Sequence, residues 1–594
     1  MKFIYILHVW VLSLVSLSHL GTGARILAAF FCPARSHFMM THAIIRELVK
    51  RGNEVTFITP VSMGKEELGP NYKEILFAPY DSWNDIRETT KISSAMELTD
   101  LPIFDFFRMV YTMGIHSTDF AFEQPEIQAV INEKNQIGKY DLLITEQFFN
   151  EGALILGHLY QIPIVTLSMS GYANYLSQLV GIVSPWSYVP HKWMAYTDRM
   201  TLWERIGNAF VSGSEDLYRE FKYYPKQDAI LRKHFSNLLA RVPTIKELER
   251  NISAILLNTY LPLASPRPTS FNMIQVGGVH IESPKELPKD LQEFLDEATH
   301  GAIYFSLGSQ VRSAELRPEK LKIFLKVFDS LKQRVLWKFE NETLPELPPN
   351  VKVQRWLPQG DVLAHPNVKV FIAHGGLFGI QEAVYHGVPV LGMPVYGDQS
   401  LNLQRGKSLG CALVLDYRRL SEDELRSSLI ELLENPQYRS NMKEASRVYR
   451  NRPLSAMDTA IYWIEYVITH RGAPYLVANG VHLPWYQFYL LDVIGVVFFI
   501  AFQSQSYRLP HHTFHFRIFY VPLSALSSQN GGPMLAMREL RPSNSSSVLA
   551  RSLPVAREFL CPILFEIRMN ANRFVANTLD PAWMAFAGHL QHLS

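Results

Sequence analysis

Near its N-terminus the chain reads ILAAFF from Ile26 to Phe31, then CPARSH from Cys32 to His37, and later EVTFIT from Glu54 to Thr59. Both apolar runs have the length and composition of buried strands. An amphipathic helical pattern lies between them and ends at Gly52. This order of strand, helix and strand predicts a βαβ unit, and therefore a parallel sheet.

Further strand signals fall into two groups along the chain. The first group continues at Asp141–Thr145 and Ile162–Leu167, with a helix expected at Gly152–Leu159 between them. A proline-rich segment, Leu261–Asp290, then separates it from the second group. The second group comprises Ala302–Leu307, Arg334–Phe339, Lys352–Trp356, Lys369–Ala373 and Val388–Met393. The sequence therefore predicts an α/β chain of two doubly wound, Rossmann-like halves that face each other across a ligand-binding cleft.

The composition excludes several classes of function. The chain has 594 residues, of which 47% are apolar and 19% charged, and this is the composition of a globular protein. A net charge of +2 argues against a nucleic-acid partner. Three cysteines (Cys32, Cys411 and Cys561) cannot form a disulfide framework, and their spacing predicts no zinc site. No GxGxxG motif is present, so a dinucleotide-dependent oxidoreductase is not expected.

The first 24 residues have the pattern of a secretory signal peptide. Lys2 supplies a positive charge, an apolar stretch follows, and small residues precede Arg25. Cleavage at that point would place the mature chain in the lumen of the endoplasmic reticulum, and a retained anchor is the alternative. Glycosylation sequons at Asn251, Asn341 and Asn544 suit that compartment.

A phosphate-binding turn is expected at the end of one strand of the second half. The chain reads HGGLFGIQE from His374 to Glu382, directly after the strand at Lys369–Ala373. Its first two glycines let a ligand approach the backbone, and the helix that follows favours an anion by about 0.3–1 kcal/mol. His374 adds a hydrogen bond or a charge. Glu382 lies about two turns along the same helical face, where its carboxylate can accept two sugar hydroxyls.

Residues on either side extend this pattern. Trp356 follows a strand and offers its plane to a base, and such stacking is worth about 1–3 kcal/mol. Asp398 and Gln399 follow another strand end and can hold the hydroxyls of a second sugar. A base, a ribose, a diphosphate and a hexose together describe a nucleotide-sugar. Each residue alone could instead serve only the fold, and a Trp after a strand is often a core residue.

The segment from Trp356 to Gln399 resembles the donor-binding motif of the UDP-glycosyltransferases, insect members included, a family with the two-domain GT-B fold. Phe305–Ser309 and Leu483–Gln487 add to this resemblance, which covers about Arg25 to Phe502. It implies an acceptor-binding domain at 25–265, a linker at 266–290 and a UDP-sugar-binding domain at 291–480.

The resemblance also implies which residues hold the donor. Those residues are Trp356 for uracil, Gln359 and Glu382 for the ribose, Ser309, His374 and Gly376 for the diphosphate, Asp398 and Gln399 for the hexose, and Gly375 and Gly379 beside them. The UDP-sugar is a co-substrate, and no separate cofactor and no metal are expected. UDP-glucose is the donor we expect first and UDP-glucuronate second.

Sugar transfer also requires a base for the acceptor hydroxyl. His37 follows the first strand, where the carboxyl edge of the sheet faces the cleft, and its reference pKa of about 6.5 suits this task. The resemblance assigns the base to this position and implies inversion at the anomeric carbon. Glu146, after the strand at Asp141–Thr145, is expected to orient the ring. Many relatives carry the shorter Asp there.

The acceptor is expected to be a small lipophilic molecule with a hydroxyl. Two aromatic-rich runs could form its site or could be ordinary core, namely Phe104, Phe106, Phe107, Met109 and Tyr111, and Tyr172, Tyr175, Trp186 and Tyr188. A homodimer is left open. One alternative function is a UDP-sugar-binding protein without turnover. Another is a GT-B phosphorylase with a pyridoxal cofactor, which no residue context supports.

The C-terminal end departs from the family pattern. The apolar stretch at 493–502 stops at Gln503, and as a helix it covers about 15 Å, against about 30 Å of hydrocarbon. We therefore expect 488–502 to be a truncated anchor-like segment, which leaves membrane association open. Residues 503–594 form an unassigned tail, expected to come from an alternative exon, a retained intron or a frame change. His511, His512 and His515 within it could be read as a metal cluster, but no scaffold surrounds them.

Overall fold

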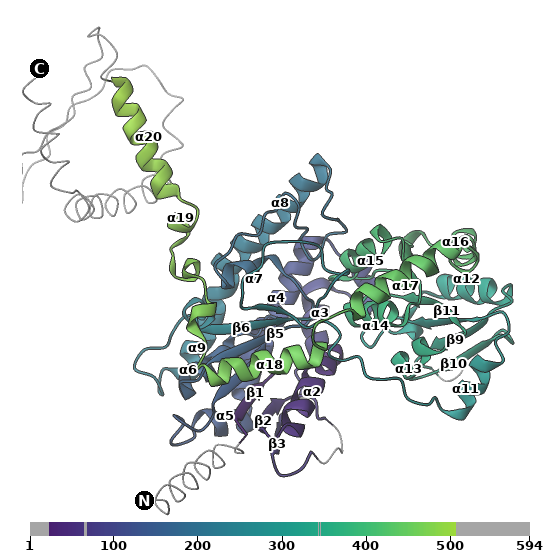
Figure 1. Cartoon of the computed structure of the whole chain (residues 1–594), viewed down its shortest axis with the longest axis horizontal. Coiled ribbons are helices and arrows are strands. Elements are labelled where there is room, and N and C mark those ends of the chain that lie inside the picture. The colour runs from purple at the N-terminus through teal and green to yellow at the C-terminus, as the bar shows by residue number, and fades with distance from the viewer. Residues whose placement is uncertain (1–22, 64–67, 342–343, 345, 507–594) are drawn as a thin grey trace, which may run out of the picture. The chain divides into compact units, whose positions relative to one another are not determined.

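The computed structural model describes residues 23–63, 68–341, 344 and 346–506 (Figure 1). The expected signal peptide lies almost entirely outside these residues, and Asn544, Cys561, the histidines at 511–515 and the tail from 507 onward lie wholly outside them. The chain divides into two compact units between His482 and Leu483.

A seven-stranded parallel sheet forms the centre of what we call the N-terminal lobe. Its strands run in the order β3-β2-β1-β4-β5-β6-β7. They are β1 Arg25–Ala29, β2 Glu54–Thr59, β3 Tyr72–Leu76, β4 Leu142–Glu146, β5 Ile164–Ser168, β6 Ile252–Leu257 and β7 Met273–Gln275. β1, β4, β5 and β6 are almost wholly buried, as expected for strands covered by helices on both faces.

Helices cover both faces of this sheet. They are α2 Arg35–Lys50, α3 Ser82–Thr90, η1 Ala95–Asp100, α4 Ile103–Glu123, α5 Pro125–Ile131, η2 Glu151–Leu154, α6 Ile155–Tyr160, α7 Asn174–Leu179, α8 Leu202–Tyr218, η3 Arg219–Tyr223, α9 Tyr224–Phe235 and α10 Ile245–Glu249. α8 begins at a capping box in which Thr201 and Glu204 satisfy each other's backbone N–H groups. It continues into η3, a π-helical turn.

A second parallel sheet, of six strands, forms the centre of the C-terminal lobe. Its order is β10-β9-β8-β11-β12-β13. The strands are β8 Ala302–Ser306, β9 Arg334–Lys338, β10 Val351–Gln354, β11 Val368–Ala373, β12 Val390–Gly392 and β13 Ala412–Val414. The helices are α11 Lys289–Asp296, η4 Ser313–Glu315, α12 Pro318–Asp329, α13 Gln359–Ala364, α14 Leu377–His386, α15 Gln399–Ser408, η5 Tyr417–Arg419, α16 Glu422–Glu434 and α17 Pro436–Arg450.

The expected pair of doubly wound halves is confirmed, with two differences in where the lobes begin and end. β7 lies inside the segment 266–290 that its prolines mark as a linker, yet it pairs with β6 and extends the N-terminal sheet. α18, at Ala456–Thr469, falls within the expected second domain at 291–480 but packs on the first lobe, beside α2 (Figure 1). Its apolar face, with Ile461 and Ile464, completes the core under α2.

The segment after α18 contains η6 Pro474–Leu476, η7 Asn479–His482, α19 Trp485–Phe488 and α20 Leu491–Ser506. The anchor-like residues 488–502 fall mainly in α20, which has many exposed apolar side chains. Within the described part of the chain, no helix has both the length and the apolar character needed to cross a membrane.

Candidate active site

A histidine–glutamate pair lies at the carboxyl edge of the N-terminal sheet. β1 and β4 are adjacent and parallel, with Ala28 opposite Ile144, so the residues that follow the two strands meet at one edge. His37 stands in the first turn of α2 and Glu146 ends β4. The imidazole Nδ1 lies 2.9 Å from the carboxylate Oε2.

The surroundings of the pair fix its orientation. The Glu146 side chain is only 1% exposed, whereas that of His37 is 12% exposed. Asn150 donates from Nδ2 to the second carboxylate oxygen, Oε1, at 3.3 Å. The ring of Phe148 meets the imidazole edge-on, with 4.4 Å between the ring centroids. Since Nδ1 is bonded to the carboxylate, Nε2 is the nitrogen available to take a proton from a substrate.

A cavity of about 710 Å³ lies between the two lobes and has the size of a small-molecule site. His37 lines it from the N-terminal lobe. Most of the donor-binding residues predicted from the sequence line it from the other lobe, namely Ser309, Trp356, Gln359, His374, Gly376, Gly379, Glu382, Asp398 and Gln399. Glu146 does not line the cavity and contacts it only through the imidazole of His37.

Gly375 is the one predicted donor-binding residue that does not reach the cavity wall. Its φ is +91°, and a Cβ there would lie 2.6 Å from the side chain of Leu403 and 2.9 Å from the carbonyl oxygen of Gln399. Its own carbonyl accepts a hydrogen bond from Asn402 Nδ2 at 3.1 Å. Gly375 therefore shapes the turn between β11 and α14, a conformation that favours glycine, and Gly376 meets the cavity in its place.

The His374 ring lies against two glycines. A Cβ on Gly308 would come within 2.6 Å of the ring, and one on Gly376 within 2.5 Å. Burial, with a smaller effect from Lys338, lowers the pKa of His374 to about 4, so the ring is neutral near pH 7. Its Nδ1 has no hydrogen-bond partner among the described residues. Of the two options that the sequence allows, His374 therefore suits a hydrogen bond and not a positive charge.

Glu382 and Gln359 form a hydrogen-bonded pair in the cavity wall. Gln359 Nε2 donates to Glu382 Oε2, and Tyr304 donates its hydroxyl to Gln359 Oε1 at 3.3 Å. Burial raises the pKa of Glu382 to about 7; the bond from Gln359 opposes this shift and the charge of Asp361 adds to it. The free carboxylate oxygen, Oε1, suits a sugar diol.

Trp356 is not a core residue, because 65% of its surface is exposed. Its ring is open to stacking, and the ammonium nitrogen of Lys338 lies 5.7 Å from the ring centroid. Lys338 ends β9, lines the same cavity and pairs with Glu340 at 2.8 Å. Lys338 was not among the residues predicted from the sequence, although its position at a strand end was the signal that could have revealed it.

Asp398 and Gln399 begin α15 beside this wall. Asp398 accepts a hydrogen bond from Asn402 Nδ2 at 2.9 Å, and burial raises the pKa of its carboxyl. The side-chain amide oxygen of Gln399, Oε1, accepts hydrogen bonds from the backbone N–H groups of Val395 and Tyr396, at 2.8 and 3.1 Å. One oxygen of Asp398 and the amide nitrogen of Gln399 thus remain for hydroxyls of a ligand.

The apolar wall near His37 comes mainly from α4. Phe106 and Met109 belong to the first predicted aromatic run and line the cavity. Tyr111 in that run is instead fully buried, and Phe104 is half exposed outside the cavity. The second run, from Tyr172 to Tyr188, contributes no residue to the wall. Several wall residues scattered along the chain were not predicted from the sequence, including Trp83, Val110, Met113, Phe148, Phe149, Trp193 and Tyr396.

The predicted base and two residues beside it have the elements of a metal site. Ligand atoms of Cys32, His37 and Glu146 all lie within 4.8 Å of one another. However, burial, with a smaller effect from Glu146, raises the pKa of the Cys32 thiol, and a thiol must lose its proton to bind a metal. Both Glu146 oxygens already accept hydrogen bonds from His37 and Asn150. The group fits a hydrogen-bonded catalytic pair better than a metal centre.

Comparison with known protein families agrees with the resemblance found in the sequence. The family model described as "UDP-glucoronosyl and UDP-glucosyl transferase" matches residues 28–519. The chain belongs to this family. Its match spans both lobes and every cavity residue named above.

Curated UDP-glycosyltransferases resemble the chain over most of its length. UDP-glycosyltransferase UGT5 of Dactylopius coccus is 35% identical over 491 residues, which cover 82% of this chain and 91% of that protein. UDP-glucuronosyltransferase 2B15 of Rattus norvegicus is 32% identical, covering 77% of this chain and 87% of that protein. The first name specifies no particular sugar and the second specifies glucuronate, so the comparison gives the family and not the donor.

Solved glycosyltransferase structures share the fold, and the expected GT-B architecture is confirmed. The glycotransferase of kitacinnamycin aligns with a TM-score of 0.51 at 22% identity, covering 75% of this chain and 99% of that one. A UDP-glucosyltransferase from Polygonum tinctorium aligns with a TM-score of 0.51 at 16% identity, covering 76% and 99%.

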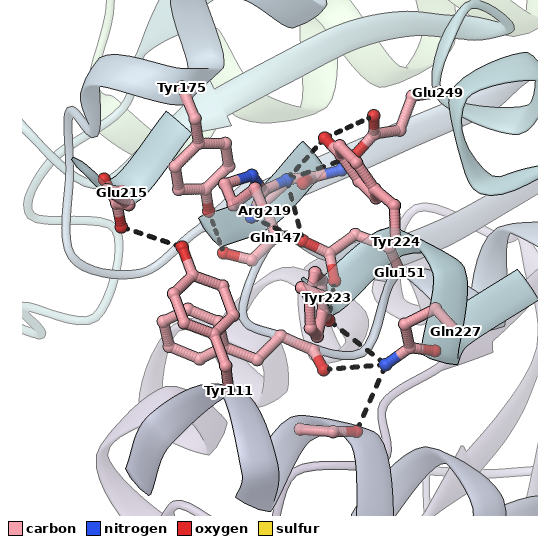
Figure 2. Close-up of polar contacts among 12 residues, drawn as sticks. Tyr111, Gln147, Glu151, Tyr175, Glu215, Arg219, Tyr223, Tyr224, Gln227 and Glu249 are labelled. Carbon is pink, nitrogen blue, oxygen red and sulfur yellow. Dashed lines mark hydrogen bonds and ion pairs between the residues drawn. The ribbon is translucent and has the colours of Figure 1, made fainter. Parts of the chain in front are cut away.

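A buried polar network lies in the N-terminal lobe (Figure 2). Arg219 Nη1 lies 3.3 Å from Glu151 Oε1, and Nη2 lies 3.4 Å from Glu249 Oε1. Tyr224 accepts from Arg219 at 2.9 Å, and the guanidinium lies over the ring of Tyr175, 4.0 Å from its centroid. A buried polar group that loses its partner costs free energy, so this network favours one position of η3 and α9.

Proposed function

We propose that the chain transfers a hexose from a UDP-sugar to the hydroxyl of a small lipophilic acceptor, with inversion at the anomeric carbon. The observation that carries this proposal is the cavity itself, because one wall holds His37 and the opposite wall holds the donor-binding residues. The resemblance places a shorter aspartate at this position in many relatives, yet Glu146 still pairs with His37 at 2.9 Å. This pairing favours an enzyme over a binding protein without turnover.

The chemistry assigned to the pair is general base catalysis. The acceptor oxygen attacks the anomeric carbon while the bond from that carbon to the diphosphate oxygen breaks and UDP leaves. The hydroxyl proton passes to His37 Nε2, and Glu146 stabilises the imidazolium that forms. Attack from the face opposite the leaving group inverts the anomeric carbon.

The donor-binding roles follow the positions of the side chains. We assign uracil to the exposed face of Trp356 and the ribose to Gln359 and Glu382. We assign the diphosphate to the turn at His374, with Ser309 and Gly376 beside it, and the hexose to Asp398 and Gln399. The neutral His374 and the backbone N–H groups at the start of α14 would stabilise the UDP leaving group without a metal. UDP-glucose is our first choice of donor and UDP-glucuronate our second.

One assay tests the proposed function. Purified protein is incubated with radiolabelled UDP-glucose or UDP-glucuronate and a panel of phenols, in the presence of a chelator. Labelled glycoside identifies the enzyme and its donor, and its anomeric configuration tests inversion. Binding of UDP without any product in either arm would instead establish a UDP-sugar-binding protein.

The titration of Glu382 predicts how donor affinity depends on pH. A carboxylate accepts hydroxyl groups that a protonated carboxyl does not, and the pKa of Glu382 is raised to about 7. We expect the affinity for UDP-glucose to be highest above pH 7 and to fall below it by up to about tenfold per pH unit. UDP-glucose is the better probe, since the terminal phosphate of UDP itself titrates at about pH 6.

The matched variant for this test is Glu382→Gln, which keeps the shape of the side chain and removes its charge. Its affinity should be lower than that of the wild type at pH 8 and nearly independent of pH. His374 does not interfere, because its pKa is lowered to about 4 by burial and by Lys338. Parallel pH profiles for the two proteins would exclude Glu382 as the ribose ligand.

We also propose that the chain acts in the lumen of the endoplasmic reticulum. The charged, apolar and small-residue pattern of residues 1–24 supports this, and so does the exposed position of Asn251 in its sequon. Digestion with a glycan-specific endoglycosidase tests this, and an unglycosylated Asn251 in the native host would count against it.

A further inference from the structure

A buried lysine lies in the cavity wall and has no role in the donor motif. Lys192 stands in the loop between α7 and α8 and lines the cavity, yet only 4% of its surface is exposed. Its Nζ lies 4.7 Å from the ring centroid of Trp193, 4.8 Å from that of Tyr175 and 5.2 Å from that of Phe149. These rings attract the cation and exclude water, but they do not accept its hydrogen bonds in the way an anion does.

The carboxylate that faces Lys192 within its own lobe is already engaged. Glu215 accepts from Tyr111 at 2.8 Å through Oε1 and lies 2.9 Å from His191 Nε2 through Oε2 (Figure 2 shows the bond from Tyr111). No carboxylate of the described residues lies within ion-pair distance of Lys192 Nζ. A buried ammonium without a close anion is costly, and burial lowers the pKa of Lys192.

Lys192 lines the same cavity as the proposed base and Asp398. The charges of both Lys192 and His37 lower the pKa of Asp398, opposing the effect of its burial. All three side chains line the same cavity, Lys192 and His37 from the N-terminal lobe and Asp398 from the other. The free N–H groups of Lys192 therefore belong to the part of the cavity where, by the proposed function, the hexose meets the acceptor.

We propose that Lys192 Nζ binds a carboxylate of a substrate, and so makes the enzyme selective for a substrate that carries one. This inference rests on the proposed function. The carboxylate has two sources, because it is either the C6 carboxylate of a hexuronate donor or an acid group on the acceptor. The uncharged rings around the ammonium of Lys192 match a small apolar molecule with one acidic group.

Two substrate pairs, each differing by one carboxylate, test this assignment in the wild type and in Lys192→Met. The donor pair is UDP-glucuronate and UDP-glucose, with 4-nitrophenol as acceptor. The acceptor pair is 4-hydroxyphenylacetate and its methyl ester, with the donor that gives more product. We expect Lys192→Met to lower kcat/KM by about 10- to 150-fold for the acidic member of one pair, since a hydrogen bond between charged groups is worth about 1.5–3 kcal/mol.

The neutral members distinguish this role from a structural one. For these members kcat/KM should change by no more than about threefold, well below the factor of about ten that corresponds to 1.4 kcal/mol. Lys192→Arg should retain the preference for the acidic member. Lys338→Met removes another lysine of the cavity wall, one that is paired with Glu340, and should not discriminate between the members of either pair.

The proposal is overturned if Lys192→Met lowers kcat/KM equally for both members of each pair, because Lys192 would then be a counter-ion of Glu215. It is also overturned if Lys192→Met changes kcat/KM for neither member. A wild type that turns over no substrate would overturn the proposed function instead. In that case calorimetric titration with the same four compounds still tests Lys192, and equal affinity of wild type and Lys192→Met for both acidic compounds would reject it.

Discussion

Replacing His37 with alanine should lower the rate of sugar transfer by about 10²- to 10⁴-fold, the range typical of a general base, and leave UDP binding intact. The reason lies in the geometry, since His37 Nδ1 is held by Glu146 at 2.9 Å and Nε2 is the nitrogen available to the acceptor hydroxyl. Single-turnover kinetics measure the loss, and calorimetric titration with UDP shows whether the donor wall is unaffected.

His116→Ala is the matched control for this prediction. His116 Nδ1 lies 2.8 Å from Asp85 Oδ1, so the two histidine–carboxylate pairs have nearly the same geometry in the same lobe. Neither His116 nor Asp85 lines the cavity, and the rate should stay close to that of the wild type. Near-full turnover by His37→Ala would remove this histidine from the role of base.

Arg219→Met should destabilise the protein by about 3–5 kcal/mol, the usual cost of removing one partner from a buried ion pair. The guanidinium is almost completely buried and holds Glu151, Glu249 and Tyr224 together. Burial raises the pKa of Glu249 to about 8, but without Arg219 both carboxyls would remain buried with one partner fewer. The urea concentration at the unfolding midpoint, followed by far-ultraviolet circular dichroism, measures the loss.

A surface arginine provides the control for Arg219. Arg447 Nη2 lies 2.6 Å from Glu444 Oε1, and both side chains are more than half exposed. Exposed pairs of this kind contribute little because water and salt screen them, so Arg447→Met should leave the midpoint unchanged. Equal midpoints for Arg219→Met and the wild type would show that the network in Figure 2 does not support the lobe.

The fold could be predicted from the sequence wherever local pattern and tertiary packing agree. EVTFIT coincides with β2. An apolar run rich in β-forming residues, placed between a helix-ending glycine and a turn, is stable in an α/β lobe only as a buried strand. β7 was not predicted because prolines around a three-residue strand suggest a linker. The apolar face of α18 is visible in the sequence, but nothing in one helix indicates which lobe it covers.

The candidate site divides in the same way. Apart from Ser309, the predicted donor-binding residues lie in one contiguous segment. Parallel strands place their carboxyl ends at a single edge, so Trp356, His374 and Asp398 could be grouped before the structure was known. The residues of the apolar wall near His37 do not follow one another along the sequence in this way. Phe149, Lys192 and Trp193 come from irregular loops, and only long-range packing brings them to the cavity.

The account depends most on how a UDP-sugar lies in the cavity, and a crystal structure of the His37→Ala variant with intact UDP-glucose measures this directly. We expect uracil against Trp356, the diphosphate at the turn of His374, and the anomeric carbon facing the position of residue 37. A nucleotide bound away from Trp356, or an anomeric carbon on the side remote from residue 37, would contradict the account.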